Sequence, residues 1–243
     1  MNKKTRNWII TGAAAVLLVG AGGYAFLDQY LGNQVEITKA IPAGSSTVNS
    51  APADASANAA ESQEGGAVVD PAQLNGEWAI AADSKVYFSV TTSRETVNFE
   101  NTAVSGSWVI DLEDSAKMKA DGKIDMTQVS SGNGQRDGHI QQAEFFNVAE
   151  FPEASFTASS FEGLPAEWTE GSVYDFTMNG TLTVKGIDKE VSFDGQALYQ
   201  EGQVRLSGLT KVTFADFGME NPHSVVLETE NDISVQLELV LER

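Results

Sequence analysis

The chain has 243 residues and a formal net charge of −19, from 15 Lys and Arg against 34 Asp and Glu. Nucleic-acid affinity depends on basic residues that neutralise phosphates, so this balance excludes a dedicated DNA- or RNA-binding protein. The absence of cysteine excludes disulfides, thiolate metal sites and cysteine nucleophiles. With two histidines in the chain, no metal site is expected.

Residues 1–31 predict a membrane anchor. Residues 3–6 carry three positive charges, and the stretch from Trp8 to Leu27 is apolar and uncharged. A helix of this length can cross a hydrocarbon core of about 30 Å, and the preceding charges place the N-terminus in the cytoplasm. A cleaved signal peptide is the alternative interpretation. An uncleaved anchor predicts a single-pass protein of the cell membrane with an extracytoplasmic C-terminal domain. A cleaved signal peptide predicts a secreted protein.

Residues 32–72 predict a flexible linker. Between Pro42 and Gly66 the sequence is almost entirely Ala, Ser, Gly, Asn, Pro and acidic residues, without an aromatic side chain. Such a composition cannot bury enough apolar surface to offset the entropy of ordering. The linker is therefore expected to be disordered, either as a spacer that lifts the domain off the membrane or as a domain edge with no spacing role.

Residues 73–243 predict one all-β domain. Apolar and polar residues alternate with a period of two in Val86–Val90, Trp108–Leu112, Tyr174–Val184 and Ser234–Leu239. Glycine-containing turn signals separate such runs, at Asp121-Gly122, Gly132-Asn133-Gly134, Asp194-Gly195 and Glu201-Gly202. Only Arg136–Phe146 and Pro165–Trp168 have helical character. The pattern is typical of an antiparallel sandwich or a closed barrel.

Four segments together resemble the YceI-like family. Arg136–Phe156 resembles its Arg-Asp-x-His signature with the following paired phenylalanines, Trp78–Phe88 its first hairpin, Gly180–Val191 a later strand pair, and Phe214–Met219 its Asp-Phe-Gly corner. The resemblance implies an extended eight-stranded antiparallel barrel of lipocalin-like shape with one or two short helices. Here one N-terminal transmembrane helix and a disordered linker would precede it.

The same resemblance implies a lipid ligand. Family barrels hold an isoprenoid chain or a quinone tail, so an amphiphilic lipid and the membrane are the expected partners, and no cofactor beyond such a bound lipid is required. No protein partner can be named from the sequence. The candidate tunnel wall consists of one methionine and eleven aromatic residues: Phe88, Phe99, Trp108, Phe145, Phe146, Phe151, Phe156, Phe176, Met178, Phe193, Phe214 and Phe217. The alternative is that these rings pack a dry core, because side chains often fill small barrels.

Arg136, Asp137 and His139 form the sharpest polar cluster of the sequence. They are candidates for a polar mouth that orients a lipid head group. The alternative is that Asp137 caps a short helix, which the basic residues fix to a strand.

Enzyme activity is not predicted, and no catalytic residues are assigned. The chain has no Gly-x-Ser-x-Gly elbow, no glycine-rich phosphate loop and no His-Glu-x-x-His motif. The expected function is extracytoplasmic binding, sequestration or transport of an amphiphilic lipid. The alternative is a non-catalytic extracellular interaction module with a filled barrel core.

Overall fold

The computed structural model describes residues 32–42, 45–47, 66–222 and 228–243. The strands are β1 (Ser46–Thr47), β2 (Gly76–Ile80), β3 (Lys85–Thr92), β4 (Thr96–Asn101), β5 (Val104–Ile110), β6 (Lys119–Asp125), β7 (Glu153–Glu162), β8 (Ser172–Val184), β9 (Ile187–Gln200), β10 (Gln203–Thr213) and β11 (Thr229–Glu242). The α-helices are α2 (Pro71–Leu74) and α3 (Gly134–Ile140), and the 3-10 turns are η1 (Ser115–Lys117), η2 (Met126–Gln128) and η3 (Ala215–Phe217).

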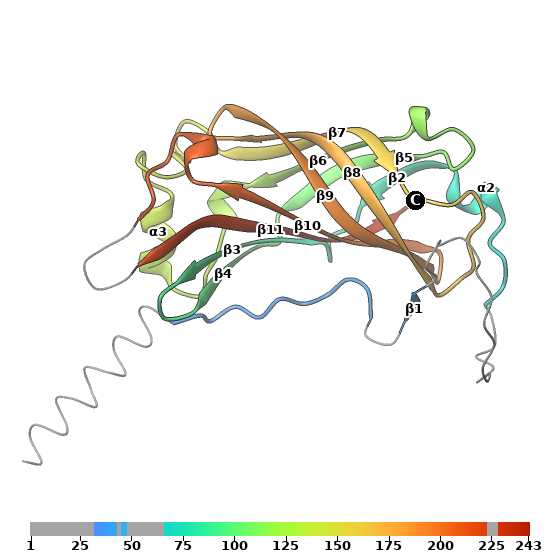
Figure 1. Cartoon of the computed structure of the whole chain (residues 1–243), viewed down its shortest axis with the longest axis horizontal. Coiled ribbons are helices and arrows are strands. Elements are labelled where there is room, and N and C mark those ends of the chain that lie inside the picture. Colours follow the sequence, from blue (N-terminus) through green and yellow to red (C-terminus); the bar gives the residue numbers. More distant parts are fainter. Residues whose placement is uncertain (1–31, 43–44, 48–65, 223–227) are drawn as a thin grey trace, which may run out of the picture.

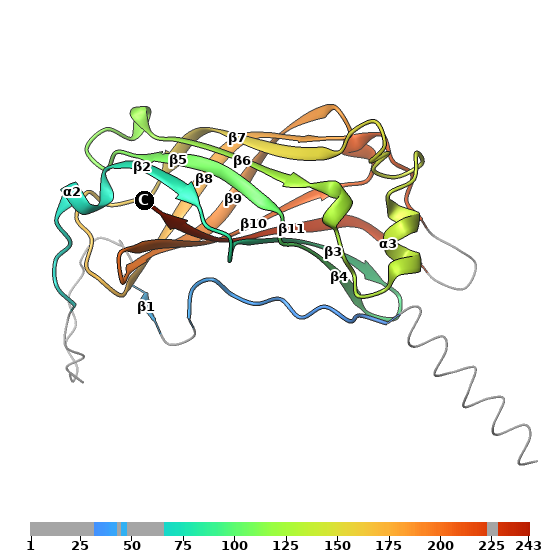
Figure 2. The same cartoon turned by 180° about the vertical axis from the view of Figure 1, so that it is seen from behind.

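Eight strands form a closed antiparallel barrel, as predicted. The order is β10-β9-β8-β7-β6-β5-β2-β11, and pairing of β10 with β11 closes the ring. The β3–β4 hairpin continues the wall where β2 ends, because β11 pairs first with β3 and then with β2. Figures 1 and 2 show α3 and α2 at opposite ends of the barrel, and these ends are called the α3 end and the α2 end.

Two predicted turns lie inside strands. Gly122 is within β6 and Gly195 is within β9, where it pairs with Gly208 of β10. A side chain at Gly195 would meet the ring of Phe176 at 2.9 Å. The chain does not reverse at Gly195. Glycine is required there because the Phe176 ring packs directly against the backbone of the wall.

The helices also differ from the prediction. Helix α3 begins at Gly134, with the Asn133 side chain as its N-cap, and ends at Ile140, so the expected helix to Phe146 is too long. The chain then turns back, with the Phe146 N–H donating to the Ile140 carbonyl at 3.1 Å. Residues 165–168 are not helical. The second helix is α2, whose N-cap is Asp70.

Residues 32–42, here called the strap, lie along the outside of the barrel. The Thr38 N–H donates to the Tyr87 hydroxyl at 3.1 Å, and the Ala40 N–H donates to Glu238 Oε2 at 2.7 Å. In Figure 1 the strap is the blue segment below β3 and β4. This part of the expected flexible linker is therefore held on the barrel wall.

Ordered packing also begins before the expected domain boundary at residue 73. Val69 is buried, and its N–H donates to the Trp168 carbonyl at 2.8 Å. Residues 48–65 of the expected linker and residues 1–31 of the expected anchor lie outside the described residues. Within the described residues, no helix is long and apolar enough to span a membrane.

Candidate functional site

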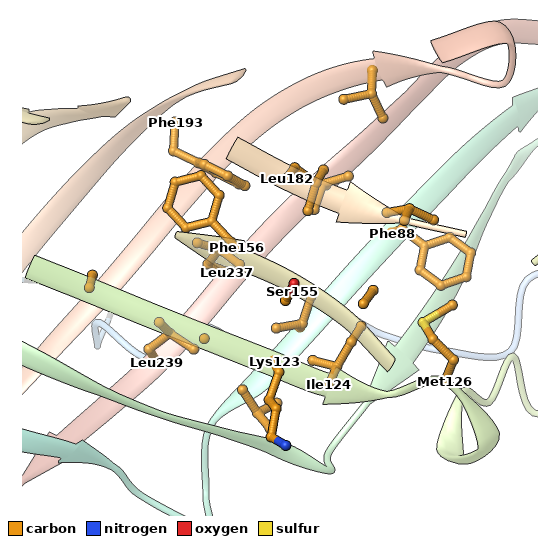
Figure 3. Close-up of a pocket in the computed structure, with 18 of the residues that line it drawn as sticks. Phe88, Lys123, Ile124, Met126, Ser155, Phe156, Leu182, Phe193, Leu237 and Leu239 are labelled. Carbon is orange, nitrogen blue, oxygen red and sulfur yellow. The ribbon is translucent and has the colours of Figure 1, made fainter. Parts of the chain in front are cut away.

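An apolar cavity of about 110 Å³ lies inside the barrel. Strand alternation builds its wall, since residues of one parity on each strand face inward. The lining residues are Ile80, Val86, Phe88, Val104, Trp108, Ala120, Gly122, Lys123, Ile124, Met126, Phe146, Ala154, Ser155, Phe156, Met178, Leu182, Val184, Phe193, Val212, Phe217, Met219, Ile233, Val235, Leu237 and Leu239. Figure 3 shows Phe156, Phe193 and Leu182 on one side of the space, and Ile124 and Leu239 on another.

Lys123 and Ser155 also border the cavity, but they are exposed residues of the opposite parity to Ile124 and Phe156, and they pair across β6 and β7. The Lys123 ammonium lies 2.7 Å from Glu153 Oε1. About half of each of these two charged side chains is exposed, so water screens the ion pair and it contributes little to stability. The interior is therefore suited to an apolar chain.

An aromatic plug fills the α2 end of the barrel. It consists of Trp78, Trp108, Phe161, Trp168 and Tyr174, all buried. The Trp78 indole N–H donates to the Leu74 carbonyl at 2.8 Å, and the Trp168 ring lies 4.9 Å from that of Tyr174. The Trp168 indole N–H donates to the Pro165 carbonyl at 3.0 Å, and because buried indole donors need partners, the two bonds fix both indole rings in place. The cavity therefore extends from the plug toward the α3 end.

Half-buried and flexible side chains surround the cavity at the α3 end. The Phe146 ring meets the edge of Phe88 at 5.4 Å, and Phe88 stacks on Phe99 at 4.5 Å. Met126 and Met219 complete this part of the lining. Methionine has three rotatable bonds and adapts to irregular shapes.

Seven of the twelve candidate tunnel residues line the cavity: Phe88, Trp108, Phe146, Phe156, Met178, Phe193 and Phe217. The other five, Phe99, Phe145, Phe151, Phe176 and Phe214, do not. Phe99 lies behind Phe88, and Phe145 lies against His139 with ring centroids 5.0 Å apart. Phe151 packs under the β8–β9 turn, close to Gly186, and Phe214 packs beneath η3.

Phe176 shows why the sequence could not separate the two groups. Tyr174, Phe176 and Met178 are successive inward residues of β8. Tyr174 is in the plug, Phe176 packs against Gly195, and Met178 lines the cavity. Their position along the barrel axis decides their role, and alternation within one strand carries no information about that position.

The candidate tunnel wall of aromatic residues and Met178 does not include the aliphatic part of the lining. Ile233, Val235, Leu237 and Leu239 all face the cavity from β11. The alternation of this strand was the available signal, because one face of it is uniformly apolar.

The three candidate polar mouth residues are not among the residues that line the cavity. Asp137 accepts hydrogen bonds from the N–H and the hydroxyl of Ser131, and Arg136 Nε donates to the Ser131 hydroxyl at 2.8 Å. These bonds fix α3 to the turn before it. His139 is exposed, with Nδ1 3.8 Å from Glu144 Oε1.

Asp216, in η3 at the α3 end, has a carboxyl group whose pKa is lowered by its hydrogen bonds. The Lys189 ammonium donates to Oδ1 at 2.6 Å, and the Thr213 N–H donates to Oδ2 at 2.8 Å. These bonds, with that from Lys189 the larger cause, lower the pKa of Asp216. The bonds tie β9 to the turn that follows β10.

The chain matches the YceI-like domain over residues 78–241. A 95-residue segment is 33% identical to Protein YceI of Salmonella arizonae, covering 39% of this chain and 46% of that protein. The chain thus spans about half the length of the curated relatives it matches.

Two solved structures share the fold. Burkholderia cenocepacia BcnA is 19% identical with a TM-score of 0.56, over 65% of this chain and 96% of that one. A polyisoprenoid-binding domain from Saccharophagus degradans, implicated in plant cell wall breakdown, is 14% identical with a TM-score of 0.52, over 69% and 98%. The family match covers more than half of the chain, and with the closed barrel it establishes that the chain belongs to the YceI-like family.

Proposed function

We propose that the protein binds the apolar chain of an isoprenoid, a quinone or a similar amphiphile inside the barrel, and that the proposed N-terminal anchor holds it outside the cytoplasm. The cavity carries this proposal, because its lining is apolar apart from Lys123 and Ser155. Burial of each ligand methylene contributes about 0.8 kcal/mol, so a long chain needs no charged partner. The polyisoprenoid-binding domain with the same fold supports the ligand class.

The cavity must widen to take such a ligand. Its volume of about 110 Å³ is below the roughly 300–1,000 Å³ of common ligand pockets. Phe146 is half-buried, and Met126, Met178 and Met219 have flexible side chains that adapt to irregular shapes. Ligand entry therefore proceeds with rotation of these side chains.

The small volume also favours a second candidate function. A barrel whose side chains leave no room for a ligand would be a rigid scaffold, and its acidic outer surface would contact another protein through complementary charge. The two functions differ in one observable, which is whether a ligand chain enters the interior.

The test uses the exported chain, residues 32–243, which retains the strap. A quinone with an alkyl tail of about ten carbons is titrated while tryptophan fluorescence is followed, since Trp108 lines the cavity. Val235→Phe fills part of the cavity. If it excludes about two ligand methylenes, it weakens binding by about 1.6 kcal/mol, or about 15-fold in Kd.

Val191→Phe is the matched control, because Val191 packs against the core without lining the cavity. Equal weakening by both variants, or saturable quenching that neither changes, would place the quinone outside the barrel. A folded wild-type chain with no saturable quenching would favour the scaffold.

A further inference from the structure

The strap is held at several points along its length. Its half-buried residues Asn33, Val35 and Ile37 alternate with the exposed Gln34 and Glu36. This alternation is that of an extended segment with one face on the wall. The strap therefore follows one defined path across the outside of the barrel.

The later part of the strap is anchored on β11 and β10. Glu238 is 2% exposed although it points outward, and its carboxylate accepts from the Ala40 N–H and from the Lys39 ammonium, at 2.7 and 3.1 Å. Arg205 Nη1 donates to the Ala40 carbonyl at 3.2 Å. Ser207 and Gln236 of the barrel also donate to this carboxylate, so Glu238 joins the strap to β10 and β11 through charge-assisted hydrogen bonds.

The first residues of the strap lie at the α3 end. The Gly32 carbonyl accepts from Arg136 Nη2 of α3 at 3.2 Å. The Asn33 N–H donates at 3.0 Å to Glu95, next to the tip of the β3–β4 hairpin. Both views of the molecule show the start of the strap at this end. The first described residue, Gly32, therefore lies beside α3.

The sequence leaves little chain between this point and the proposed anchor. The apolar stretch ends at Leu27, and residues 28–31 separate it from Gly32. A chain spans at most about 3.6 Å per residue, so five steps reach about 18 Å. A membrane that holds the stretch up to Leu27 must lie within that reach of Gly32.

From these observations we infer that the strap orients the barrel on the membrane, with the α3 end toward the bilayer, and that a lipid enters the cavity from the bilayer at this end. The inference rests on the proposed anchor. It agrees with the cavity, whose opposite end is filled by the aromatic plug. Residues 48–65 follow the strap in the chain, so their length does not set the distance between barrel and membrane. The inference therefore favours the alternative stated for this segment, a domain edge with no spacing role.

The full chain in lipid nanodiscs tests the orientation. The loop that carries η1 lies at the α2 end, because the Leu112 N–H donates to Asn75, the C-cap of α2, at 2.9 Å. Because the chain has no cysteine, Ala143→Cys near the α3 end and Ala116→Cys in η1 each give a single dye site on an exposed alanine. The lipid head groups carry the acceptor dye. Strand β9 has 14 residues, which at about 3.3 Å each separates the two ends by tens of ångströms, so the energy transfer from position 143 exceeds that from position 116 at least about two-fold.

A strap variant and its control show whether the strap causes the orientation. Thr38→Pro with Ala40→Pro removes the two N–H donors that bind Tyr87 and Glu238. We expect the difference between the two dye positions to fall. Thr38→Ala keeps both N–H groups and should keep the difference.

A flexible Gly-Ser insertion of about ten residues, placed before the strap in one variant and after it in another, shows which segment sets the distance between barrel and membrane. Between Gln29 and Tyr30 it should reduce transfer from both dyes, whereas within residues 48–65 it should change neither. If the chain incorporates into nanodiscs and the two dyes transfer equally, or position 116 transfers more, the orientation is wrong while the anchor stands. A chain that does not incorporate contradicts the anchor and the orientation together.

Discussion

Asp216 links three parts of the α3 end through one carboxylate. It accepts from Lys189 of β9 and from the N–H and hydroxyl of Thr213, the last residue of β10. An ionised carboxylate accepts such bonds more strongly than a protonated one, which is why its pKa is lowered. The bonds therefore hold the turn that carries Phe217, a cavity residue, in place.

Stability should depend on pH through this group. In the unfolded chain the carboxyl titrates near its usual value of about 3.9. A lower pKa in the folded state means that its stabilisation is complete above that value and is lost as the pH falls through the folded pKa. Asp216→Asn should therefore lower the free energy of unfolding at about pH 7 and lower it much less at about pH 3.

Urea titrations of both proteins at several pH values measure this difference. Asp83→Asn is the control, because Asp83 is exposed and none of the described residues forms an ion pair or hydrogen bond with its side chain. A difference for Asp216→Asn that stays constant between these pH values would show that the carboxylate charge is not what stabilises the turn.

At the scale of the elements, the curvature of the wall depends on close backbone contacts. Gly180 of β8 lies opposite Ala158 of β7, where the pairing of the two strands shifts register. A Cβ atom at Gly180 would lie 2.3 Å from the Thr157 carbonyl oxygen and 2.6 Å from the Phe156 ring. Both distances are far below van der Waals contact, so the strands must move apart if any side chain is added.

Gly180→Ala should consequently destabilise the barrel by about 1–3 kcal/mol, the usual cost of overpacking. Thermal unfolding should show a fall in Tm of about 2–4 °C per kcal/mol for a domain of this size. Gly208→Ala is the matched control, since the nearest atom to its added Cβ lies 3.7 Å away. The same Tm for both variants would mean that the strands separate there without cost.

Strand alternation predicted the main strands and the all-β class, because one face of each strand is buried in the core, and the family resemblance distinguished the closed barrel from a sandwich. Alternation did not predict that α3 ends at Ile140, after which the chain turns back before β7 and passes through Asn147 at a φ of 48°. Nor did it reveal the strap. Asn33, Val35 and Ile37 alternate with polar residues, but the run is short and adjoins a segment of linker composition. Its partners, Tyr87 and Glu238, are distant in sequence.

At the scale of the whole molecule, three features share one axis. The aromatic plug fills the α2 end, the apolar cavity extends from it toward α3, and the strap brings the start of the described chain to that same end. A ligand chain in this arrangement would be buried along the barrel axis, and its head group would remain near the α3 end. Specificity would then depend on cavity length and on the side chains around Phe146.

Mass spectrometry of an organic extract of the purified chain 32–243, exported by a bacterial host, tests the central claim most directly. The account predicts about one isoprenoid or quinone molecule per barrel, and a reduced amount in Val235→Phe at equal folded protein. A folded protein that yields no lipid, both as purified and after incubation with polyprenol and quinone vesicles, would contradict it.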